Sequence, residues 1–517
     1  MFGSVRHGVF WPTFIVLLAA VVASAVNLEG FLSVASTANT WVLDKFAWLY
    51  SLSGLYLLVL AALVYFSKLG RIRIGGDAAT PLITKRRWFF ITLCTTLAVG
   101  ILFWTTAEPL YHTMAPPESA GLQPGSADAA VFAMSTMFVH WAFTPYAIYA
   151  IPSLVFALVF YNRRDKLSIA SMLAPLFGPG VHRYATLIDA VSLYALVLGM
   201  ASSLGTGGLS ISGGIAQFIG GDATPFRLAL VIAAIVIVFV LSAASGLQKG
   251  IAQLSTLNAY LLLALGVFTL VVGPTTYMLG LGTESFGVFL DTFFEKSVFT
   301  GTAADDQWAN DWTVFYWAVW FAWAPMAALF LGKISRGYTV REFIQVNLIF
   351  PALFAIVWVT IFGGLAIYQQ LEAGADPYTV LTDEGIEVLL YTIFRDLPLA
   401  WLWIPLLVLI AFVSYVTAAD SQTDAIGNLC TRNVTADSDL NAGVPMKVVW
   451  GVIIGSVSWV MVSFVGIDGV RMLSNLGGLP SMIIVLVATS ALWIWMRQPE
   501  LLALPAEVGK KEEHADA

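Results

Sequence analysis

The sequence predicts an all-α polytopic membrane protein, and two observations predict it. Of its 517 residues, 59% are hydrophobic and 11% are charged, and the mean hydropathy is +0.83. No water-soluble core could bury so much apolar surface, which excludes a soluble enzyme. In addition, apolar segments of about 20 residues, the length that a helix needs to cross a bilayer, recur along the whole chain.

Twelve apolar segments follow one another, so we predict twelve transmembrane helices. They lie at residues 9–26, 47–67, 88–110, 129–161, 187–217, 228–247, 251–275, 312–332, 344–368, 399–420, 447–466 and 472–496. The first segment is too long for a signal peptide and lacks a small-residue cleavage pattern, so we expect it to be retained.

The basic residues predict the orientation of these helices. When the loops alternate between two sides, five of the 25 Lys and Arg residues fall on one side and the other twenty on the opposite side. The five are Lys45, Arg227, Lys296, Arg395 and Arg471. The positive-inside rule then makes both termini cytoplasmic, and we expect a multi-pass protein of a bacterial-type inner membrane. The short basic run after the second segment lies between membrane segments, which argues against a nucleic-acid partner.

Three of the segments contain residues that interrupt helices. The third runs through Gly100 to Glu108 and Pro109, the fourth contains Pro145 and Pro152, and the fifth contains a Ser/Gly/Thr run at 202–208. An interrupted helix releases backbone groups that must find partners in a cavity or in neighbouring helices. We therefore expect binding sites at these breaks.

The order of the segments suggests two inverted repeats. The third and the eighth segment each begin a block of five, and because five is odd the second block enters the membrane from the opposite face. The predicted divisions are a tail with two leading helices (1–87), a first repeat (88–275), an outer loop with an amphipathic helix (276–311), a second repeat (312–497) and a short cytoplasmic tail (498–517).

Residues 311–343 form the most distinctive stretch of the chain, DWTVFYWAVWFAWAPMAALFLGKISRGYTVREF. Tyr316, Trp320 and Trp323 recur at i, i+4 and i+7, so their rings share one helical face. Aromatic faces at mid-membrane depth suit a weakly hydrated cation such as a trimethylammonium group, which has no N–H to donate. Anchoring at the membrane interface is the alternative, and it applies best to Trp312 and Tyr316 near the helix entry.

This stretch resembles the characteristic segment of the betaine/choline/carnitine transporter (BCCT) family. The matching residues are Trp312-Thr313, Phe315-Tyr316-Trp317-Ala318, Trp320, Trp323, Ile334-Ser335-Arg336-Gly337 and Arg341-Glu342-Phe343, whereas the family has Trp where this chain has Val319. The resemblance extends from Val9 to Arg497 and is also strong at 71–75, 140–149 and 245–250. It implies two leading helices followed by two inverted five-helix repeats, which is the LeuT-like fold, and a homotrimer among membrane lipids.

The resemblance also implies an aromatic substrate box. Trp141, Tyr149 and Trp320 match residues that line the box of the family, and Tyr146 stands where other members have Trp. The candidate substrate-binding residues are Trp141, Tyr146, Tyr149, Trp317, Trp320, Trp323 and Gly100. The implied protein is a secondary transporter of a quaternary ammonium compound, with no enzymatic activity and no cofactor beyond a coupling ion.

Gly100 bears on the choice of substrate. Choline-transporting relatives tend to have Asp at this position, so its absence favours a zwitterion such as glycine betaine, carnitine or a sulfonium analogue. Choline uptake and sodium-independent carnitine-type exchange remain the alternatives. An amino-acid transporter of the same fold is more remote, and replacing Trp320 by Leu would leave such a protein largely active.

The coupling ion stays open among Na⁺ symport, H⁺ symport and substrate exchange. In the run FVSYVTAADSQTD, Thr417 is retained, but Ala418 stands where sodium-driven members have a second hydroxyl. In the fifth segment, Leu196 and Met200 occupy places where hydroxyls are expected. Buried His140 and Glu108 are candidates for a proton, with a structural role as the alternative. The candidate ion-coupling positions are Thr417, Ala418, Leu97, Met200 and His140.

Other functional classes find little support in the sequence. Cys94 and Cys430 lie in different segments without metal-ligand spacing, and the five His residues are scattered, which argues against a metal or haem site. A channel would need a polar pore or a filter loop. A membrane enzyme would need a nucleophile and a base at matching depth. We find none of these patterns.

Overall fold

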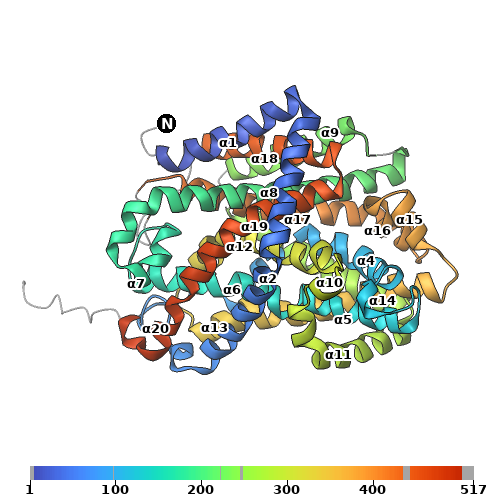
Figure 1. The fold of residues 1–517 in the computed structure, drawn as a ribbon, viewed down its shortest axis with the longest axis horizontal. Coiled ribbons are helices and arrows are strands. Elements are labelled where there is room, and N and C mark those ends of the chain that lie inside the picture. The colour runs from blue at the N-terminus through green and yellow to red at the C-terminus, as the bar shows by residue number, and fades with distance from the viewer. Residues whose placement is uncertain are drawn as a thin grey trace, which may run out of the picture.

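The regular structure of the protein is helical, as predicted (Figure 1). The computed structural model describes residues 5–96, 98–221, 223–244, 248–432, 434 and 443–502. Two isolated β-bridges, between Val5 and Thr431 and between Arg73 and Thr339, are the β-structure of these described residues. Leu97, residues 245–247 of the predicted family segment 245–250, and the tail from 503 to 517 lie outside them.

Each of the twelve predicted segments corresponds to a helix or to a bent pair of helices. These are α1 (His7–Val26), α2 (Leu28–Phe66), α3 (Lys85–Thr96) with α4 (Ala98–Met114), α5 (Ala127–Trp141) with α6 (Phe143–Ala157), α8 (Ala185–Ile219), α9 (Pro225–Ala244), α10 (Gln248–Val272), α12 (Phe315–Lys333), α14 (Phe350–Leu371), α17 (Ala400–Leu429), α18 (Val444–Phe464) and α19 (Ile467–Thr489). Ten helices within the described ranges are long and apolar enough to cross a membrane, and α5 with α6 counts as one of them. The number rises to 12 if two bent pairs, Lys85–Thr96 with Gly100–Met114 and Thr256–Val272 with Thr275–Val298, are each one span.

Shorter helices connect these spans. They are α7 (Ala174–Phe177), α13 (Val340–Ile344), α15 (Pro377–Asp383), α16 (Ile386–Arg395) and α20 (Ala491–Arg497). The helix expected in the loop 276–311 is α11 (Thr275–Val298), and the chain turns by 107° between the end of α10 and α11. In Figure 1, α1 and α11 lie at opposite edges of the molecule.

The second helix is much longer than predicted. It begins at Leu28 rather than at residue 47 and has 39 residues, with Asn27 capping its start by accepting a hydrogen bond from the Gly30 amide at 3.0 Å. At 1.5 Å per residue it is about 58 Å long, well beyond the roughly 30 Å of a bilayer core. Hydropathy detects the apolar part of such a helix and misses its more polar beginning, which explains the wrong boundary.

The fourth segment is interrupted as predicted, but at Ala142 rather than at a proline. Ala142 has φ −101° and ψ −115°, outside the helical region, and separates α5 from α6. Pro145 explains the position of the break, because its ring would clash with the carbonyl of Trp141 four residues earlier in a continuous helix. Pro152 lies within α6. The third segment is also bent, by 57° between Lys85–Thr96 and Gly100–Met114.

The predicted break in the fifth segment is wrong, because α8 continues through the Ser/Gly/Thr run for 35 residues. Its glycines allow close packing instead of an interruption. A Cβ built on Gly205 would lie 2.5 Å from Cγ1 of Val462, and one built on Gly213 would lie 2.0 Å from the carbonyl oxygen of Glu387. Neighbouring chain segments therefore approach α8 more closely than a side chain would permit.

The long helices form two groups that are joined by α19. In the first group, α4, α5 and α14 pack against one another and α6 packs against α12. In the second group, α8, α9, α17 and α18 pack together, and α19 contacts both α12 and α8. The aromatic helix α12 is thereby held between α6 and α19, with most of its side chains buried.

The beginning of the chain is fastened to the ends of two long helices. The Arg6 guanidinium lies 2.6 Å from the buried carboxylate of Asp189 and also donates to the Leu429 carbonyl at 3.0 Å. Asp189 accepts further hydrogen bonds from the amides of Ile169 and Ala170. Asp189 is thus a buried carboxylate that is paired with a basic residue.

Candidate functional site

An aromatic cavity lies where α4, α6, α8, α12 and α19 meet. Its centre is the Trp320 ring, whose centroid lies 4.7 Å from that of Tyr149, 5.8 Å from Tyr146 and 6.0 Å from Trp141. The break at Ala142 allows Trp141 at the end of α5 and Tyr149 on α6 to face the same indole. Rings from separate segments therefore enclose one space, which we call the aromatic cavity.

The aromatic cavity has one ring-lined side and one hydroxyl-bearing side. Its lining residues are Thr95, Thr96, Gly100, Trp104, Trp141, Tyr149, Ser202, Ser203, Thr206, Phe315, Tyr316, Val319, Trp320, Trp323 and Val470. Its volume is about 80 Å³. Ligand pockets usually start at about 300 Å³, so the cavity is narrow in this conformation and must widen to hold a substrate.

Hydrogen bonds fix two of the indoles in this wall and leave a third available. Trp323 Nε1 donates to the carbonyl oxygen of Gly199 on α8 at 2.9 Å, and Trp141 Nε1 donates to Glu108 at 2.8 Å. Trp320 Nε1 is buried and has no hydrogen-bond partner among the described residues. A buried N–H normally has a partner, so that of Trp320 can donate to a bound ligand.

The predicted substrate-binding residues occupy three positions: the lining of the aromatic cavity, a layer behind that lining, and another face of α12. Trp141, Tyr149, Trp320, Trp323 and Gly100 line the aromatic cavity. Tyr146 contacts Trp320 from behind the wall and is fully buried.

Trp317 lies on another face of α12, away from the aromatic cavity. Its ring centroid is 6.0 Å from that of His140, and its Cε2 lies 3.5 Å from where a Cβ on Gly54 of α2 would stand. We had expected it to bind substrate. Trp317 lies three residues before Trp320. This spacing does not determine which face of α12 lines the cavity. In the structure, the Trp317 ring packs toward α2.

Sequence reasoning missed much of the cavity wall. Tyr316 shares a helical face with Trp320, and this spacing alone could have placed it there. Trp104 contacts Phe315 and Tyr316 with ring centroids 5.6 and 6.0 Å apart, a contact between distant segments that gave no local signal. The hydroxyls of Ser202, Ser203 and Thr206 belong to the run in α8 that we had interpreted as a helix break.

The predicted ion-coupling positions are scattered over several helices. Thr417 and Ala418 are buried in α17, and the Thr417 hydroxyl donates to the carbonyls of Val413 and Ser414 in its own helix. Met200 is buried in α8, and its carbonyl accepts from the Tyr415 hydroxyl at 3.5 Å. Leu97 lies outside the described residues.

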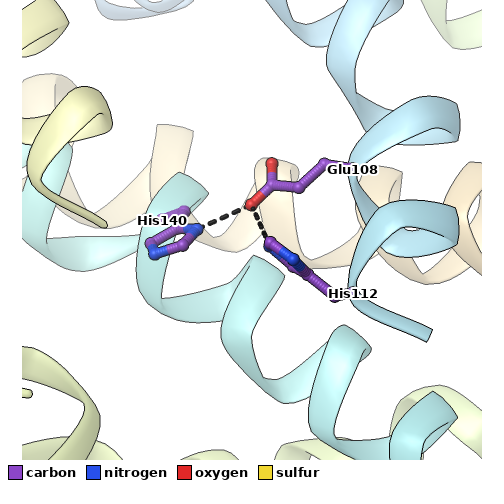
Figure 2. A group of neighbouring side chains, drawn as sticks. All are labelled: Glu108, His112 and His140. Carbon is purple, nitrogen blue, oxygen red and sulfur yellow. Dashed lines mark hydrogen bonds and ion pairs between the residues drawn. The ribbon is translucent and has the colours of Figure 1, made fainter. Parts of the chain in front are cut away.

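His140 belongs to a buried network around Glu108, which Figure 2 shows together with His112. Glu108 Oε1 lies 2.6 Å from His140 Nδ1 and 3.1 Å from His112 Nε2. Glu108 Oε2 accepts from Trp141 Nε1 at 2.8 Å and from the Tyr316 hydroxyl at 2.6 Å. We call these five residues the Glu108 network.

The five His residues are scattered in the sequence, but two of them, His112 and His140, lie close together in the structure. Atoms of Glu108, His112 and His140 lie within 4.8 Å of one another, a spacing also seen around metal ions. Both carboxylate oxygens and both His140 nitrogens are, however, already within hydrogen-bond distance of protein groups. In this structure the group therefore forms a hydrogen-bonded network.

A larger cavity of about 660 Å³ lies on the other side of His140. The walls come from α5, α11 and the segments near residues 117–122 and 308–313, and they include His140, Thr313 and Lys296. We call it the outer cavity. The Lys296 ammonium group donates to the Phe132 carbonyl and to the hydroxyls of Ser135 and Thr136, which fastens α11 to α5.

Asp306 joins two segments at the rim of the outer cavity. Its carboxylate accepts hydrogen bonds from the amide and hydroxyl of Ser119 at 3.0 and 2.6 Å and from the Trp308 amide at 2.9 Å. We call the contact between Asp306 and Ser119 the clasp. Slight desolvation acts to raise the pKa of Asp306, but these hydrogen bonds outweigh it and lower the pKa below its ordinary value.

Comparisons with known proteins place the chain in a family. Residues 8–501 match the BCCT family, described as betaine/carnitine/choline family transporter. The glycine betaine transporter OpuD of Bacillus subtilis is 30% identical over 94% of this chain and 93% of its own length. The probable glycine betaine transporter of Desulfitobacterium hafniense is 29% identical over 89% of this chain and 91% of its own.

The high-affinity choline transport protein of Escherichia coli is 28% identical over 88% of this chain and 66% of its own length. A solved Na⁺-coupled sialic acid symporter in an outward-open state has a TM-score of 0.47 and 13% identity over 87% of this chain and 86% of that chain. The family match spans nearly all of the helices that build the aromatic cavity. This chain therefore belongs to the betaine/carnitine/choline family of transporters.

Proposed function

We propose that this protein is a secondary transporter that binds a zwitterionic quaternary ammonium or sulfonium compound in the aromatic cavity and moves it by alternating access. The observation that carries the proposal is the meeting of the Trp141, Tyr149 and Trp320 rings around one buried space. A methylated onium group is attracted to the negative faces of such rings and loses little hydration on entering. Relatives named as transporters of glycine betaine and choline support this substrate class.

The polar part of the substrate meets two kinds of donor. Trp320 Nε1 is without a partner within the described part of the chain, and Ser203 lines the same cavity. Thr206 also lines it, but its hydroxyl donates to the Ser202 carbonyl at 3.3 Å. No Lys or Arg is among the lining residues, so a carboxylate is held by neutral donors. Because the cavity is this narrow, the surrounding helices must separate before the substrate enters or leaves.

The helix packing supports a division into two inverted repeats at 88–275 and 312–497. In the sequence, α8 and α9 hold the third and fourth places of the first block, and α17 and α18 hold the same places in the second. These four helices pack together. Likewise the helices in the first two places of both blocks, α4, α5, α6, α12 and α14, form the other group. Equivalent elements thus gather around the cavity from both halves.

We also propose an inner-membrane location with cytoplasmic termini and a homotrimeric assembly. The distribution of the 25 Lys and Arg residues supports the orientation, and the family resemblance supports the trimer. Labelling of single cysteines introduced at residues 4 and 301, with a reagent that does not cross membranes, tests the orientation. Native mass spectrometry in detergent tests the assembly.

Uptake by proteoliposomes tests the proposed function. Labelled glycine betaine, carnitine and choline are offered with a Na⁺ gradient, a H⁺ gradient and internal counter-substrate in turn. Independence from Na⁺ would agree with the non-ligating side chains of Ala418 and Met200, whereas strict dependence would contradict our interpretation of these two positions. Absence of uptake of every onium compound under all three conditions would overturn the proposal.

Variants of Trp320 sharpen the test. Trp320→Leu removes the aromatic face and should abolish uptake, whereas Trp320→Phe keeps a ring but removes the N–H. If Trp320 Nε1 holds the carboxylate, Trp320→Phe should weaken glycine betaine binding by a further tenfold or more relative to choline, since a hydrogen bond to a charged group contributes about 1.5–3 kcal/mol. Trp358→Leu is the matched control, because Trp358 is a buried indole on α14 outside the cavity wall.

A further inference from the structure

The Glu108 carboxylate connects the aromatic cavity to the outer cavity. Oε2 accepts from Trp141 and Tyr316, and both of these side chains line the aromatic cavity. Oε1 lies 2.6 Å from His140, which lines the outer cavity (Figure 2). Glu108 itself is fully buried on α4 and lines neither space. Its charge can therefore influence one cavity while its protonation is governed from the other.

An unbroken series of hydrogen bonds leads inward from the outer cavity. Thr313 Oγ1, which borders that cavity, lies 2.9 Å from His140 Nε2, and His140 Nδ1 lies 2.6 Å from Glu108. Glu108 in turn accepts from the Tyr316 hydroxyl at 2.6 Å. Intramembrane series of this kind, made of carboxylates and imidazoles, are a usual means of moving protons in transporters.

The hydrogen bonds fit one protonation state of the network in particular. Trp141 Nε1 and the Tyr316 hydroxyl both donate to Glu108 Oε2. With Glu108 as the ionised acceptor, the facing imidazole nitrogens, His140 Nδ1 and His112 Nε2, carry hydrogens. Both rings are then neutral and the network carries one negative charge. His140 Nε2 accepts from the Thr313 hydroxyl in this state, and His112 Nδ1 has no partner among the described residues.

A single proton from the outer cavity can be added without breaking a covalent bond. It binds His140 Nε2 while the Thr313 hydroxyl turns from donor to acceptor, or it binds His112 Nδ1. The network then changes from one negative charge to zero net charge. Removal of the proton to the outer cavity reverses the step.

We propose that the Glu108 network is a proton site that competes with the onium group of the substrate. The proposal rests on the proposed function and adds the regulation of that site. The negative charge on Glu108 attracts a cation in the adjacent cavity, and its hydrogen bonds to Trp141 and Tyr316 increase the electron density of two rings that face the cation. Protonation removes this attraction. By reciprocity, an onium group that binds expels a proton from the network by the same coupling.

Other charged and titratable side chains surround the network. On α4, Tyr111 precedes His112, and its neighbours on other elements are Tyr378, Glu387, Asp468 and Arg471. Arg471 of α19 lies 5.0 Å above the Trp312 ring and 5.4 Å above the Phe315 ring. Lys296 of α11 binds Ser135 and Thr136 on α5, close to His140. Asp128, Glu284, Glu295 and Lys296 line the outer cavity together with His140. Lys296 is the basic group among them and could produce a competing pH dependence, so the experiment includes a variant of it.

Ligand binding as a function of pH tests the proposal. Calorimetry measures the affinity of the purified, detergent-solubilised protein for choline and for glycine betaine between pH 5 and 9, and a pH-sensitive dye in weak buffer measures protons released on binding. Choline affinity should fall about tenfold per pH unit below the pH at which the network takes up its proton, with about one proton released per choline bound in that range. Choline is the cleaner probe, because it has no carboxylate.

Four variants assign the effect to the network. Glu108→Gln should bind choline weakly and without pH dependence, and the double variant His112→Gln with His140→Gln should lose the acid-side decline. Lys296→Met should keep it. His182→Gln is the matched control, because His182 is a partly exposed imidazole paired with Asp165 far along the chain from the network.

Three results would overturn the inference: a choline affinity that does not change with pH in the unmodified protein, binding without proton release, or an acid-side decline that persists in the double histidine variant. If neither compound binds at any pH, the proposed function fails instead. Should Glu108→Gln not fold, proton release by the unmodified protein and the double variant still decide the question.

Discussion

The indole nitrogen of Trp323 lies 2.9 Å from the carbonyl oxygen of Gly199, and a Cβ built on Gly199 would lie 2.9 Å from Cδ1 of the same ring. A contact shorter than 3.0 Å cannot persist, so Gly199→Ala must displace this part of the cavity wall. Overpacking costs typically 1–3 kcal/mol, and we expect glycine betaine affinity to fall by about five- to 150-fold in calorimetric titrations. Gly280→Ala on α11 is the control, because no atom lies within 4 Å of its added Cβ. An unchanged affinity in Gly199→Ala would contradict the assignment of Trp323 to the wall.

Trp317 and Trp320 are both buried in α12 but should respond differently to the same substitution. Trp317→Phe removes packing against α2 and should lower the thermal unfolding temperature by several degrees, while substrate affinity stays within about twofold of the original. Trp320→Phe should lower the affinity. Thermal unfolding and calorimetry on both variants check this. Equal losses of affinity in the two variants would mean that Trp317 also contacts substrate.

Lys296 fastens α11 over the outer cavity. Lys296→Met keeps much of the aliphatic stem but removes the ammonium group that donates to Phe132, Ser135 and Thr136. We expect backbone amides of α11 to exchange hydrogen at least tenfold faster, because about 1.5–3 kcal/mol of hydrogen bonding to a charged group is lost. Exchange mass spectrometry checks this, with Lys45→Met as an exposed control. Unchanged exchange would show that apolar contacts alone hold α11.

The clasp between Asp306 and Ser119 should depend on pH. The pKa of Asp306 is lowered in the folded protein, so the clasp stabilises the fold fully above the carboxyl's unfolded pKa and is lost as pH falls through the lower folded value. At neutral pH, Asp306→Asn should therefore increase hydrogen exchange at the Ser119 amide relative to the unmodified protein. The two proteins should converge once the pH has fallen below the lowered pKa of Asp306 in the folded protein. Asp305→Asn is the control, and a ratio that does not change with pH would contradict the prediction.

The sequence predicted the number of spans and the main aromatic residues because both depend on local patterns. A run of about 20 apolar residues suffices to place a span. Likewise Tyr316, Trp320 and Trp323 share a face through their spacing alone. Tyr149 and Trp141 came from the family resemblance, since their meeting with Trp320 depends on a break at Ala142 that sequence alone would place nearer Pro145.

The failures concern features that depend on tertiary packing. We interpreted the Gly-rich run of α8 as a helix break, because glycines occur both where a helix is interrupted and where helices pack closely. Only the contacts with Val462 and Glu387 show that close packing is the reason here. His112 and Glu108 are four residues apart on one helix, so their contact was visible in the sequence. Their meeting with His140, 32 residues from Glu108, was not.

Gly205 and Gly213 of α8 contact Val462 and Glu387 so closely that a Cβ would not fit. If α8 rotated about its long axis, side chains from other positions would clash at these contacts. We therefore expect α8 to stay in place during transport. We then expect α6 and α12, which share the aromatic wall, to be the moving parts, because α6 begins directly after the non-helical Ala142. On this basis, we expect the substrate to cross the membrane when α6 and α12 move relative to a stationary α8.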